Sequence, residues 1–229
     1  TASPGLIRAA VTRFGIALAC LILMLFVPAG TWAYWQAWLY LAVVFIPLVF
    51  AGTYLLQHSP DLIERRLKMR EPDPEQKRII AWAWLYFLAF LLLPGFDRRF
   101  GWSDVPVWLV LAADVSVLVG YAIIVLAFRE NRYAARIVQV EAEQTVISTG
   151  PYAIVRHPMY FGTLLFYLPT PIALGSYWAA LFALPICWTI VQRIRSEERI
   201  LAADLPGLAA YTEKGRYRLI PGGGWRPHE

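Results

Sequence analysis

The sequence predicts an all-α, polytopic integral membrane protein, and three observations support this fold class. Of the 229 residues, 59% are hydrophobic and only 16% are charged, whereas soluble domains carry about 25% charged residues. The mean hydropathy is +0.50. Ten Trp and twelve Tyr residues are present, and both types favour membrane–water interfaces. This composition excludes a disordered chain and argues against a soluble globular domain.

Four long apolar segments predict the first membrane spans. They cover residues 6–27, 33–56, 79–93 and 105–128. At 1.5 Å per residue the first segment would extend about 33 Å, which is enough to cross the hydrocarbon core of a bilayer. It also resembles a signal peptide, but further spans follow immediately, so we expect a retained helix. The Pro-Gly pair at 94–95 predicts the end of the third span.

Two shorter apolar segments follow a polar stretch. Residues 160–174 and 177–190 are separated by a Gly-Ser pair at 175–176, and the first segment contains Pro169 and Pro171. Proline inside a helix bends or breaks it. We therefore expect four spans followed by a bent helical hairpin, which makes five to six transmembrane helices in all.

The positive charges predict the orientation of these spans. The connections 28–32 and 96–104 carry only two of the 21 Lys and Arg residues, and the other 19 lie in the terminal segments and in the polar loops 58–78 and 129–156. The positive-inside rule then places both termini and both polar loops in the cytoplasm. Anionic lipid at that face accounts for the basic excess, so we do not predict nucleic-acid binding.

Functional groups are concentrated after residue 128, so we divide the chain into a four-helix membrane region, residues 1–128, and a C-terminal region, residues 129–229. Asp114 is an exception, because a carboxylate inside a span is often functional. The alternative, which we prefer because no second ionisable group is near it in the sequence, is that it accepts hydrogen bonds from neighbouring helices. The three histidines are dispersed and both cysteines lie in apolar runs, so no metal site is predicted.

One motif in the C-terminal region combines a helix start with basic side chains. Residues 150–162 read GPYAIVRHPMYFG, and Pro158 suits the first position of a helix, with His157 preceding it. Such a helix would direct backbone N–H groups at an anion, and Arg156 and His157 would add further donors. The alternative is an ordinary helix start, in which His157 caps the helix and Arg156 extends to lipid phosphate.

A second polar cluster follows the hairpin. Arg193 and Glu197 are four residues apart, with Glu198 beside them, so the first two would share one face of a helix. A solvated ion pair of this kind stabilises a helix only slightly. Alternatively, the carboxylate would bind a cationic or hydroxylated group and the arginine would face an anionic one. If the hairpin folds back, His157 and Glu197 would meet at one membrane face and hold one ligand.

Together these motifs resemble the isoprenylcysteine carboxyl methyltransferase family of integral membrane enzymes. The resemblance is carried by R-H-P-x-Y-x-G at 156–162, E-E-x-x-L at 197–201 and R-L-I-P at 218–221. It covers residues 137–221. Phospholipid N-methyltransferases and membrane-bound sterol reductases are more distant relatives.

The resemblance implies that the C-terminal region is catalytic and binds S-adenosylmethionine, the methyl donor, at the cytoplasmic face. The acceptor would be lipophilic, a prenylcysteine-like or other lipid-like compound among the membrane lipids. Carried over by position, the cofactor contacts would be Gln139, Gln144, Thr145, Val146, Ile147, Tyr152, His157, Pro158, Met159, Tyr160 and Glu197. The substrate contacts would be Arg193 and Arg156, and the catalytic residues would be Arg193 and Glu197.

Two other functions stay open at this point. A membrane reductase of the sterol-reductase type would use NADPH, and Arg129, Arg132 and Arg136 would suit its 2′-phosphate. A non-enzymatic carrier usually shows inverted repeats and several ionisable groups inside the membrane. The sequence shows no internal repeat and a single such residue, Asp114, so the methyltransferase interpretation is preferred.

Overall fold

The computed structural model describes residues 2–61, 63–64, 74–131, 146–204 and 217–221. Its elements are α1 (Pro4–Ala29), α2 (Trp35–His58), α4 (Pro74–Phe100), α5 (Val107–Glu130), the 3-10 helix η1 (Gly150–Ala153), α6 (Pro158–Tyr167), α7 (Thr170–Ala173), the 3-10 helix η2 (Trp178–Ala183) and α8 (Leu184–Asp204). Among the described residues, β-structure is limited to a bridge between Val155 and Tyr217. The predicted all-α class is confirmed.

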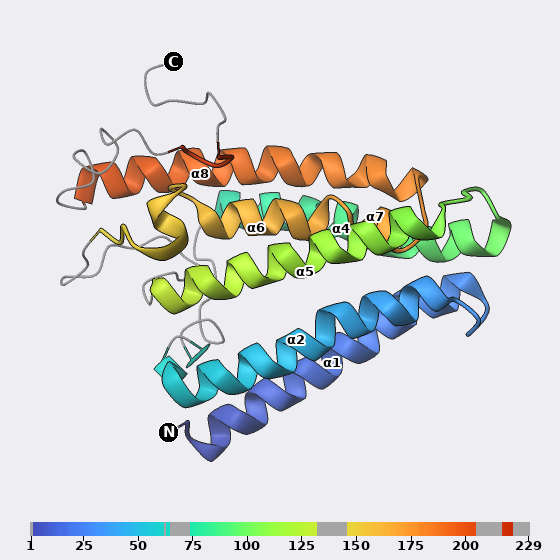
Figure 1. Ribbon diagram of the computed structural model, residues 1–229, viewed down its shortest axis with the longest axis horizontal. Helices are drawn as coiled ribbons and strands as arrows, with labels where there is room; N and C mark the ends of the chain where they lie inside the picture. Colours follow the sequence, from blue (N-terminus) through green and yellow to red (C-terminus); the bar gives the residue numbers. More distant parts are fainter. Residues whose placement is uncertain (1, 62, 65–73, 132–145, 205–216, 222–229) are drawn as a thin grey trace.

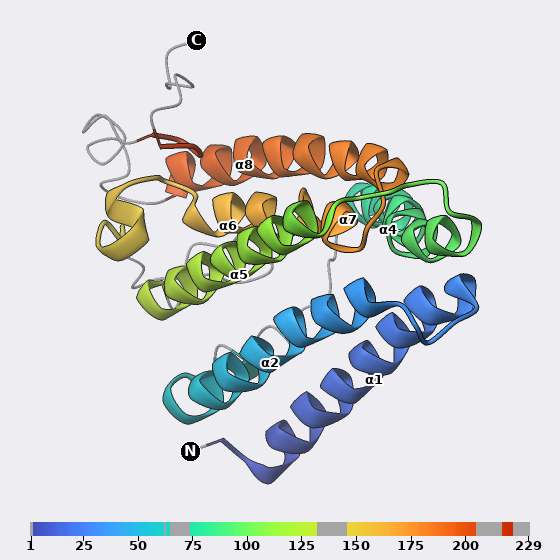
Figure 2. The same ribbon diagram turned by 45° about the vertical axis from the view of Figure 1, so that its right-hand side comes forward.

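The long helices run roughly side by side (Figure 1). The α1–α2 pair lies on one side of the bundle, inclined to α8, and α1 begins at the end of the bundle where α2 finishes (Figure 2). The C-terminal ends of α2, α5 and α8 and the start of α6 lie at this same end, which we call the site end. Of the helices that could be searched, α1, α2 and α5 are long and apolar enough to cross a membrane.

The third predicted span ends later than its Pro-Gly pair suggests. Helix α4 continues through Pro94 to Phe100. Asp97 explains the later end: its carbonyl accepts the N–H of Gly101 at 2.8 Å, and Gly101 has the positive φ of 65° that closes a helix. The Asp97 carboxylate also accepts hydrogen bonds from Ser103 and, at 2.5 Å, from the hydroxyl of Ser176. The predicted end at the Pro-Gly pair is wrong because tertiary contacts of Asp97 stabilise the additional turns of the helix.

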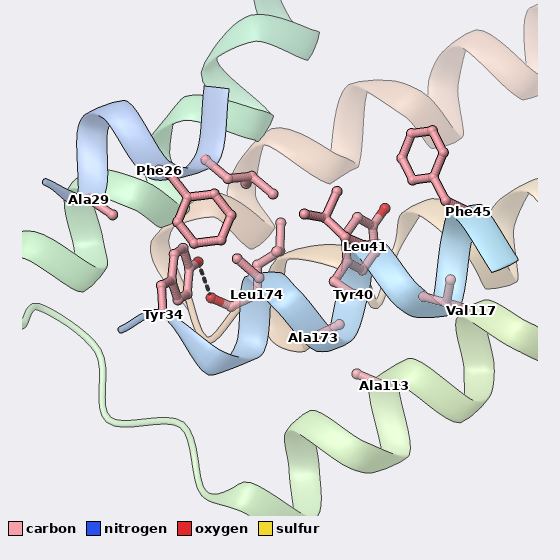
Figure 3. Packing of buried hydrophobic residues seen from close by; sticks show 12 residues of the cluster. Phe26, Ala29, Tyr34, Tyr40, Leu41, Phe45, Ala113, Val117, Ala173 and Leu174 are labelled. Atoms are coloured by element: carbon pink, nitrogen blue, oxygen red, sulfur yellow. Dashed lines mark hydrogen bonds between the residues drawn. The ribbon is translucent and has the colours of Figure 1, made fainter. Parts of the chain in front are cut away.

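The main hydrophobic core joins α1 and α2 to the rest of the bundle (Figure 3). Phe26, Tyr34 and Leu41 pack there with Ala113 of α5 and with Leu174, which follows α7. The Tyr34 hydroxyl donates a hydrogen bond of 2.5 Å to the Leu174 carbonyl. Satisfying a buried hydroxyl in this way avoids a penalty of about 1–3 kcal/mol. The α1–α2 pair is therefore anchored at the end of the bundle opposite the site end.

Two glycines bring α5 and α6 into backbone contact. A Cβ atom on Gly120 would lie 2.6 Å from the Gly162 carbonyl oxygen, and a Cβ on Gly162 would lie 2.7 Å from that of Gly120. Only residues without a side chain allow helices to approach this closely. The final glycine of the R-H-P-x-Y-x-G motif thus seats α6 on α5, which places the start of α6 at the site end.

The predicted bent hairpin is present. Helix α6 ends at Tyr167, the short α7 follows, and Gly175 reverses the chain with a φ of 76° before η2 and α8 return to the site end. Thr170 is fully buried, and its hydroxyl is hydrogen bonded to the Phe166 carbonyl at 2.8 Å. The hairpin therefore carries both motifs, one at the start of α6 and the other near the end of α8, back to the same end of the bundle.

Candidate functional site

The start of α6 has the predicted form. Pro158 occupies the first helical position and His157 precedes it, with a non-helical φ of −123° and ψ of 62°. His157 is the N-cap residue of α6, as predicted, but its side chain makes no capping hydrogen bond to this helix. Its ring, which is 8% exposed, turns toward α8 instead.

Glu198 is the carboxylate that receives this ring. His157 Nε2 lies 3.0 Å from Glu198 Oε1, and it must be the donor because a carboxylate only accepts. The same oxygen lies 3.3 Å from Arg156 Nη1, and Arg218 Nη2 lies 2.6 Å from Oε2. Arg156 is 7% exposed and faces the protein interior, so the alternative in which it extends to lipid phosphate is wrong.

Electrostatics keep Glu198 ionised. Partial burial raises the pKa of its carboxyl, but the hydrogen bond and charge of His157, together with Arg156 and Arg218, outweigh burial and lower the pKa below its usual value. Two arginines and one histidine surround a single carboxylate, so this cluster carries net positive charge. We call these four residues, Arg156, His157, Glu198 and Arg218, the Glu198 cluster.

Arg218 belongs to a described tail segment, residues 217–221, that pairs with the chain leading into α6. The backbone N–H of Arg156 donates to the Tyr217 carbonyl at 2.9 Å, and that of His157 donates to the Arg218 carbonyl at 3.2 Å. Leu219 is buried beside Tyr160 and Ile194. The tail therefore joins the start of α6 to α8, and the N–H groups of Arg156 and His157 already have acceptors.

Tyr160 links the other predicted site residues. Its hydroxyl donates to Glu197 Oε2 at 2.8 Å and accepts from Arg193 Nε at 3.4 Å. The Glu197 and Arg193 side chains are both partly buried. Thus the two neighbouring glutamates have different partners: Glu198 contacts the basic cluster, and Glu197 contacts the phenol.

The loop before α6 is attached to the end of α5. Thr149 donates to Glu130 Oε2 at 2.8 Å, and Asn131 Nδ2 donates to the Tyr152 hydroxyl at 3.3 Å. Gly150 has a φ of 55°, and a Cβ there would lie 2.6 Å from Cγ of Glu130. The turn that carries Tyr152 is thus attached to the C-terminal end of α5. In the sequence this turn comes shortly before Arg156 and His157 of the Glu198 cluster.

The structure brings together much of the predicted site. Arg156, His157, Tyr160, Arg193 and Glu197 meet where α6 begins and α8 approaches its end. Pro158 is fully buried, and Met159 packs in the small apolar cluster beneath Tyr160. Val146 and Ile147 are partly buried residues of the preceding loop. Gln139, Gln144 and Thr145, like Arg132 and Arg136, lie outside the described residues.

Glu198 and Arg218 were not among the predicted site residues, although the sequence contains a signal for the first. Ile190, Ile194 and Glu198 are spaced by four, so they form one row along α8. Ile190 and Ile194 are both buried, and this row faces α6. The prediction selected Arg193 and Glu197, which have the same spacing but form the adjacent row on α8. Arg218 could be found only through the family motif, because its contacts are distant in sequence.

Asp114 is separate from this site. It is 3% exposed, and neither carboxylate oxygen has a hydrogen-bond partner among the described residues. The preferred expectation, that neighbours donate hydrogen bonds to it, is therefore wrong. Tyr40 and Thr170 are hydrogen bonded to each other at 3.0 Å rather than to the carboxylate.

Comparison with known proteins is consistent with this geometry. Residues 108–204 match the phospholipid methyltransferase family. The fold is similar to the solved structure of the eukaryotic intramembrane Ras methyltransferase, isoprenylcysteine carboxyl methyltransferase, with a TM-score of 0.55 and 16% sequence identity. That similarity covers 90% of this chain and 72% of that chain. No curated protein matches the chain in sequence.

The matched family segment begins in α5 and ends with α8, so it contains both halves of the site except the tail. The expected resemblance is thereby confirmed. Residues 108–204 are thus similar in sequence to phospholipid methyltransferases, and the fold is similar to that of an isoprenylcysteine carboxyl methyltransferase.

Proposed function

We propose that the protein transfers a methyl group from S-adenosylmethionine to a lipophilic acceptor at the cytoplasmic face of the membrane. The observation that carries the proposal is the meeting of the two motifs: Tyr160 and Glu197 are hydrogen bonded at 2.8 Å, although they are 37 positions apart. The family match to residues 108–204 supports the reaction type. The 19-to-2 division of positive charges supports the cytoplasmic face.

The donor set at the site end suits this cofactor. Bound S-adenosylmethionine would supply an electrophilic methyl group on a sulfonium. Glu197 would bind its amino group or a ribose hydroxyl. Only Oε2 of Glu197 accepts the hydrogen bond of Tyr160, so Oε1 would accept the hydrogen bond of the cofactor. Tyr152 would offer an aromatic face to the cationic or adenine portion. The net positive Glu198 cluster would favour a carboxylate nearby.

Arg193 would orient the acceptor. It lies one helical turn before Glu197 and shares the Tyr160 hydroxyl with it, so the two side chains would contact different partners in one site. A carboxylate acceptor is already ionised at neutral pH and needs no general base, so positioning can supply much of the rate.

Calorimetric titration of the purified protein in detergent tests the cofactor. We expect S-adenosylhomocysteine to bind with micromolar affinity, about −8 kcal/mol, and NADPH not to bind. Binding of NADPH alone would contradict the proposal and favour the reductase. For the acceptor, radiolabelled methyl transfer is compared between a prenylated cysteine with a free carboxylate and phosphatidylethanolamine vesicles.

Arg193→Ala separates the two roles within the site. We expect acceptor methylation to fall at least about tenfold, the equivalent of ~1.4 kcal/mol, while S-adenosylhomocysteine affinity stays near that of the wild type. Arg195→Ala is the matched control, because Arg195 lies on the same helix with an exposed side chain. Loss of cofactor affinity with acceptor binding retained would show that Arg193 has the opposite role.

A further inference from the structure

Asp114 is a buried carboxyl group inside a helix that is long and apolar enough to cross a membrane. It lies seven residues after α5 begins at Val107, or about 10 Å along the helix axis. Asp114 is 3% exposed, and neither of its carboxyl oxygens has a hydrogen-bond partner among the residues that the structure describes. Native proteins rarely bury a polar group without a partner, and they bury an unpaired charge least of all.

The hydroxyl group with which Asp114 interacts donates its hydrogen elsewhere. Asp114 acts electrostatically on Tyr40 of α2, and the Tyr40 hydroxyl lies 3.0 Å from that of Thr170. Thr170 donates its single hydroxyl hydrogen to the Phe166 carbonyl at 2.8 Å, so Tyr40 must be the donor between the two hydroxyls. The hydrogen of Tyr40 is therefore not available to stabilise a negative charge on Asp114.

The elements around Asp114 provide no positive charge. Helix α5 packs against α2, α6, α7 and η1. Residues 35–57, 107–128, 150–153 and 158–173 cover the apolar parts of these five elements, and they contain no Lys, Arg or His. Their titratable side chains other than Asp114 are Tyr40, Tyr54, Tyr121, Tyr152, Tyr160 and Tyr167, and a tyrosine is uncharged at neutral pH. An ionised Asp114 would thus have neither a donor nor a countercharge.

Asp97 has the surroundings that an ionised buried aspartate requires. It is 1% exposed, and its carboxylate accepts hydrogen bonds from the backbone N–H and the hydroxyl of Ser103, both at 2.7 Å, and from the hydroxyl of Ser176. Hydrogen bonds to the charged form favour ionisation. Asp114 is buried to a similar degree without any of these donors, so the two carboxyl groups should differ in protonation.

We propose that Asp114 is a proton-binding site within the membrane, where the carboxyl group is protonated and neutral at neutral pH while that of Asp97 is ionised. A proton removes the charge without a basic residue and without additional space, which is how an unpaired buried carboxyl is normally accommodated. Folding then binds a proton, because an exposed aspartate is ionised above about pH 4. The inference is independent of methyl transfer, so it can be tested whatever the cofactor is.

Infrared spectroscopy of the protein purified in a maltoside detergent detects this proton directly, because the detergent has no carbonyl group of its own. At neutral pH we expect the wild type to show the carbonyl stretch of a protonated carboxyl group, with a shift in heavy water, and Asp114→Asn to lack it. Asp97→Asn and Asp104→Asn are the controls, one buried and one exposed, and both should keep the band. No band in the wild type, a band that persists in Asp114→Asn, or a band that disappears in Asp97→Asn instead would overturn the inference.

The pH dependence of thermal unfolding is a second test. A protein that binds a proton on folding loses stability as the pH rises, because its unfolded state then holds fewer protons than its folded state. Asp114→Asn has no such proton, and Asp114→Leu takes its place if the amide variant does not fold. We expect the unfolding temperature of the variant to rise relative to that of the wild type between about pH 5 and 8.

Two results of this titration would overturn the inference. The first is a constant difference between the wild type and the Asp114 variant over that pH range, as expected for the control Asp104→Asn. The second is stabilisation of the wild type, but not of Asp114→Asn, by added sodium or potassium chloride, because an ionised carboxylate with a bound cation would then replace the protonated acid.

Discussion

His157 Nε2 lies 3.0 Å from Glu198 Oε1, and the two residues are 41 positions apart in the chain. The contact joins the beginning of α6 to α8 across the whole hairpin. The same carboxylate accepts Arg156 and Arg218, so one partly buried anion holds three segments of the chain together. The Glu198 cluster is therefore the electrostatic centre around which Arg193, Glu197 and Tyr160 are arranged.

Replacing Glu198 by Gln should lower the free energy of unfolding by about 1–3 kcal/mol, because two arginines and a histidine lose a charged acceptor while they remain largely buried. Thermal unfolding in detergent measures the change. Asp104→Asn is the control, since Asp104 is exposed. Equal unfolding temperatures for the two variants would show that the Glu198 cluster does not stabilise the fold.

Stability should depend on pH through the same carboxyl. Because the folded-state pKa of Glu198 is lowered, its contribution is fully present above the unfolded-state pKa of about 4.3 and is lost as the pH falls through the lower, folded-state pKa. We expect the unfolding temperature of the wild type to decrease below about pH 4 more steeply than that of Glu198→Gln. Parallel curves for the two proteins would contradict this prediction.

Gly162→Ala should push α6 away from α5. The new methyl group would lie 2.7 Å from the Gly120 carbonyl oxygen, and overpacking of this kind costs about 1–3 kcal/mol. Gly52→Ala on α2 is the control, because a Cβ there has no neighbour within 4 Å. Differential scanning fluorimetry should show a lower unfolding temperature for the first variant only. Wild-type stability in Gly162→Ala would mean that the two helices are not in backbone contact.

Two buried aspartates should respond in opposite ways to amide substitution. Asp114→Asn replaces a buried carboxyl whose oxygens have no hydrogen-bond partner in the described part of the chain, so stability should stay the same or rise. Asp97→Asn weakens acceptors that bind Ser103 and Ser176, so it should destabilise by about 1–3 kcal/mol. Both are measured by thermal unfolding at neutral pH. A large loss in Asp114→Asn would point to a ligand held by the carboxylate.

The orientation of the bundle is a further prediction from the charge distribution. Reporter domains fused before α1 and after Pro221 should both be accessible from the cytoplasm. A fusion within the connection 101–106, which carries no Lys or Arg, should be accessible only from the opposite side. A C-terminal reporter found outside the cell would invert the site and contradict a cytoplasmic reaction.

Apolar runs and helix-breaking residues of the sequence predicted most of the fold. Apolar runs located α1, α2 and α5 to within a few residues, and the prolines and Gly175 located the bends of the hairpin. Helix α4 was predicted too short because Pro94 was weighed without the contacts of Asp97, which is distant in sequence from its partner Ser176. The rule that proline ends a helix considers only neighbouring residues. It does not include hydrogen bonds to distant residues, which here stabilise the helix after Pro94.

The site was only partly predicted, again because some of its contacts depend on tertiary packing. Motif resemblance selected Arg156, His157, Tyr160, Arg193 and Glu197, and the structure places all five at one end of the bundle. It did not distinguish the partners of the two adjacent glutamates. That choice depends on the rotation of α8 about its axis, which buried Ile190 and Ile194 determine and which a motif does not encode.

The pairing of residues 217–218 with the start of α6 makes a segment that is synthesised after both helices part of the site. Both α6 and α8 precede Arg218 in the chain, so the contacts of His157 and Arg156 with Glu198 do not include the tail. The second oxygen of Glu198 has its 2.6 Å partner from residue 218. A chain shortened before residue 217 would therefore keep the first set of contacts and lose the second.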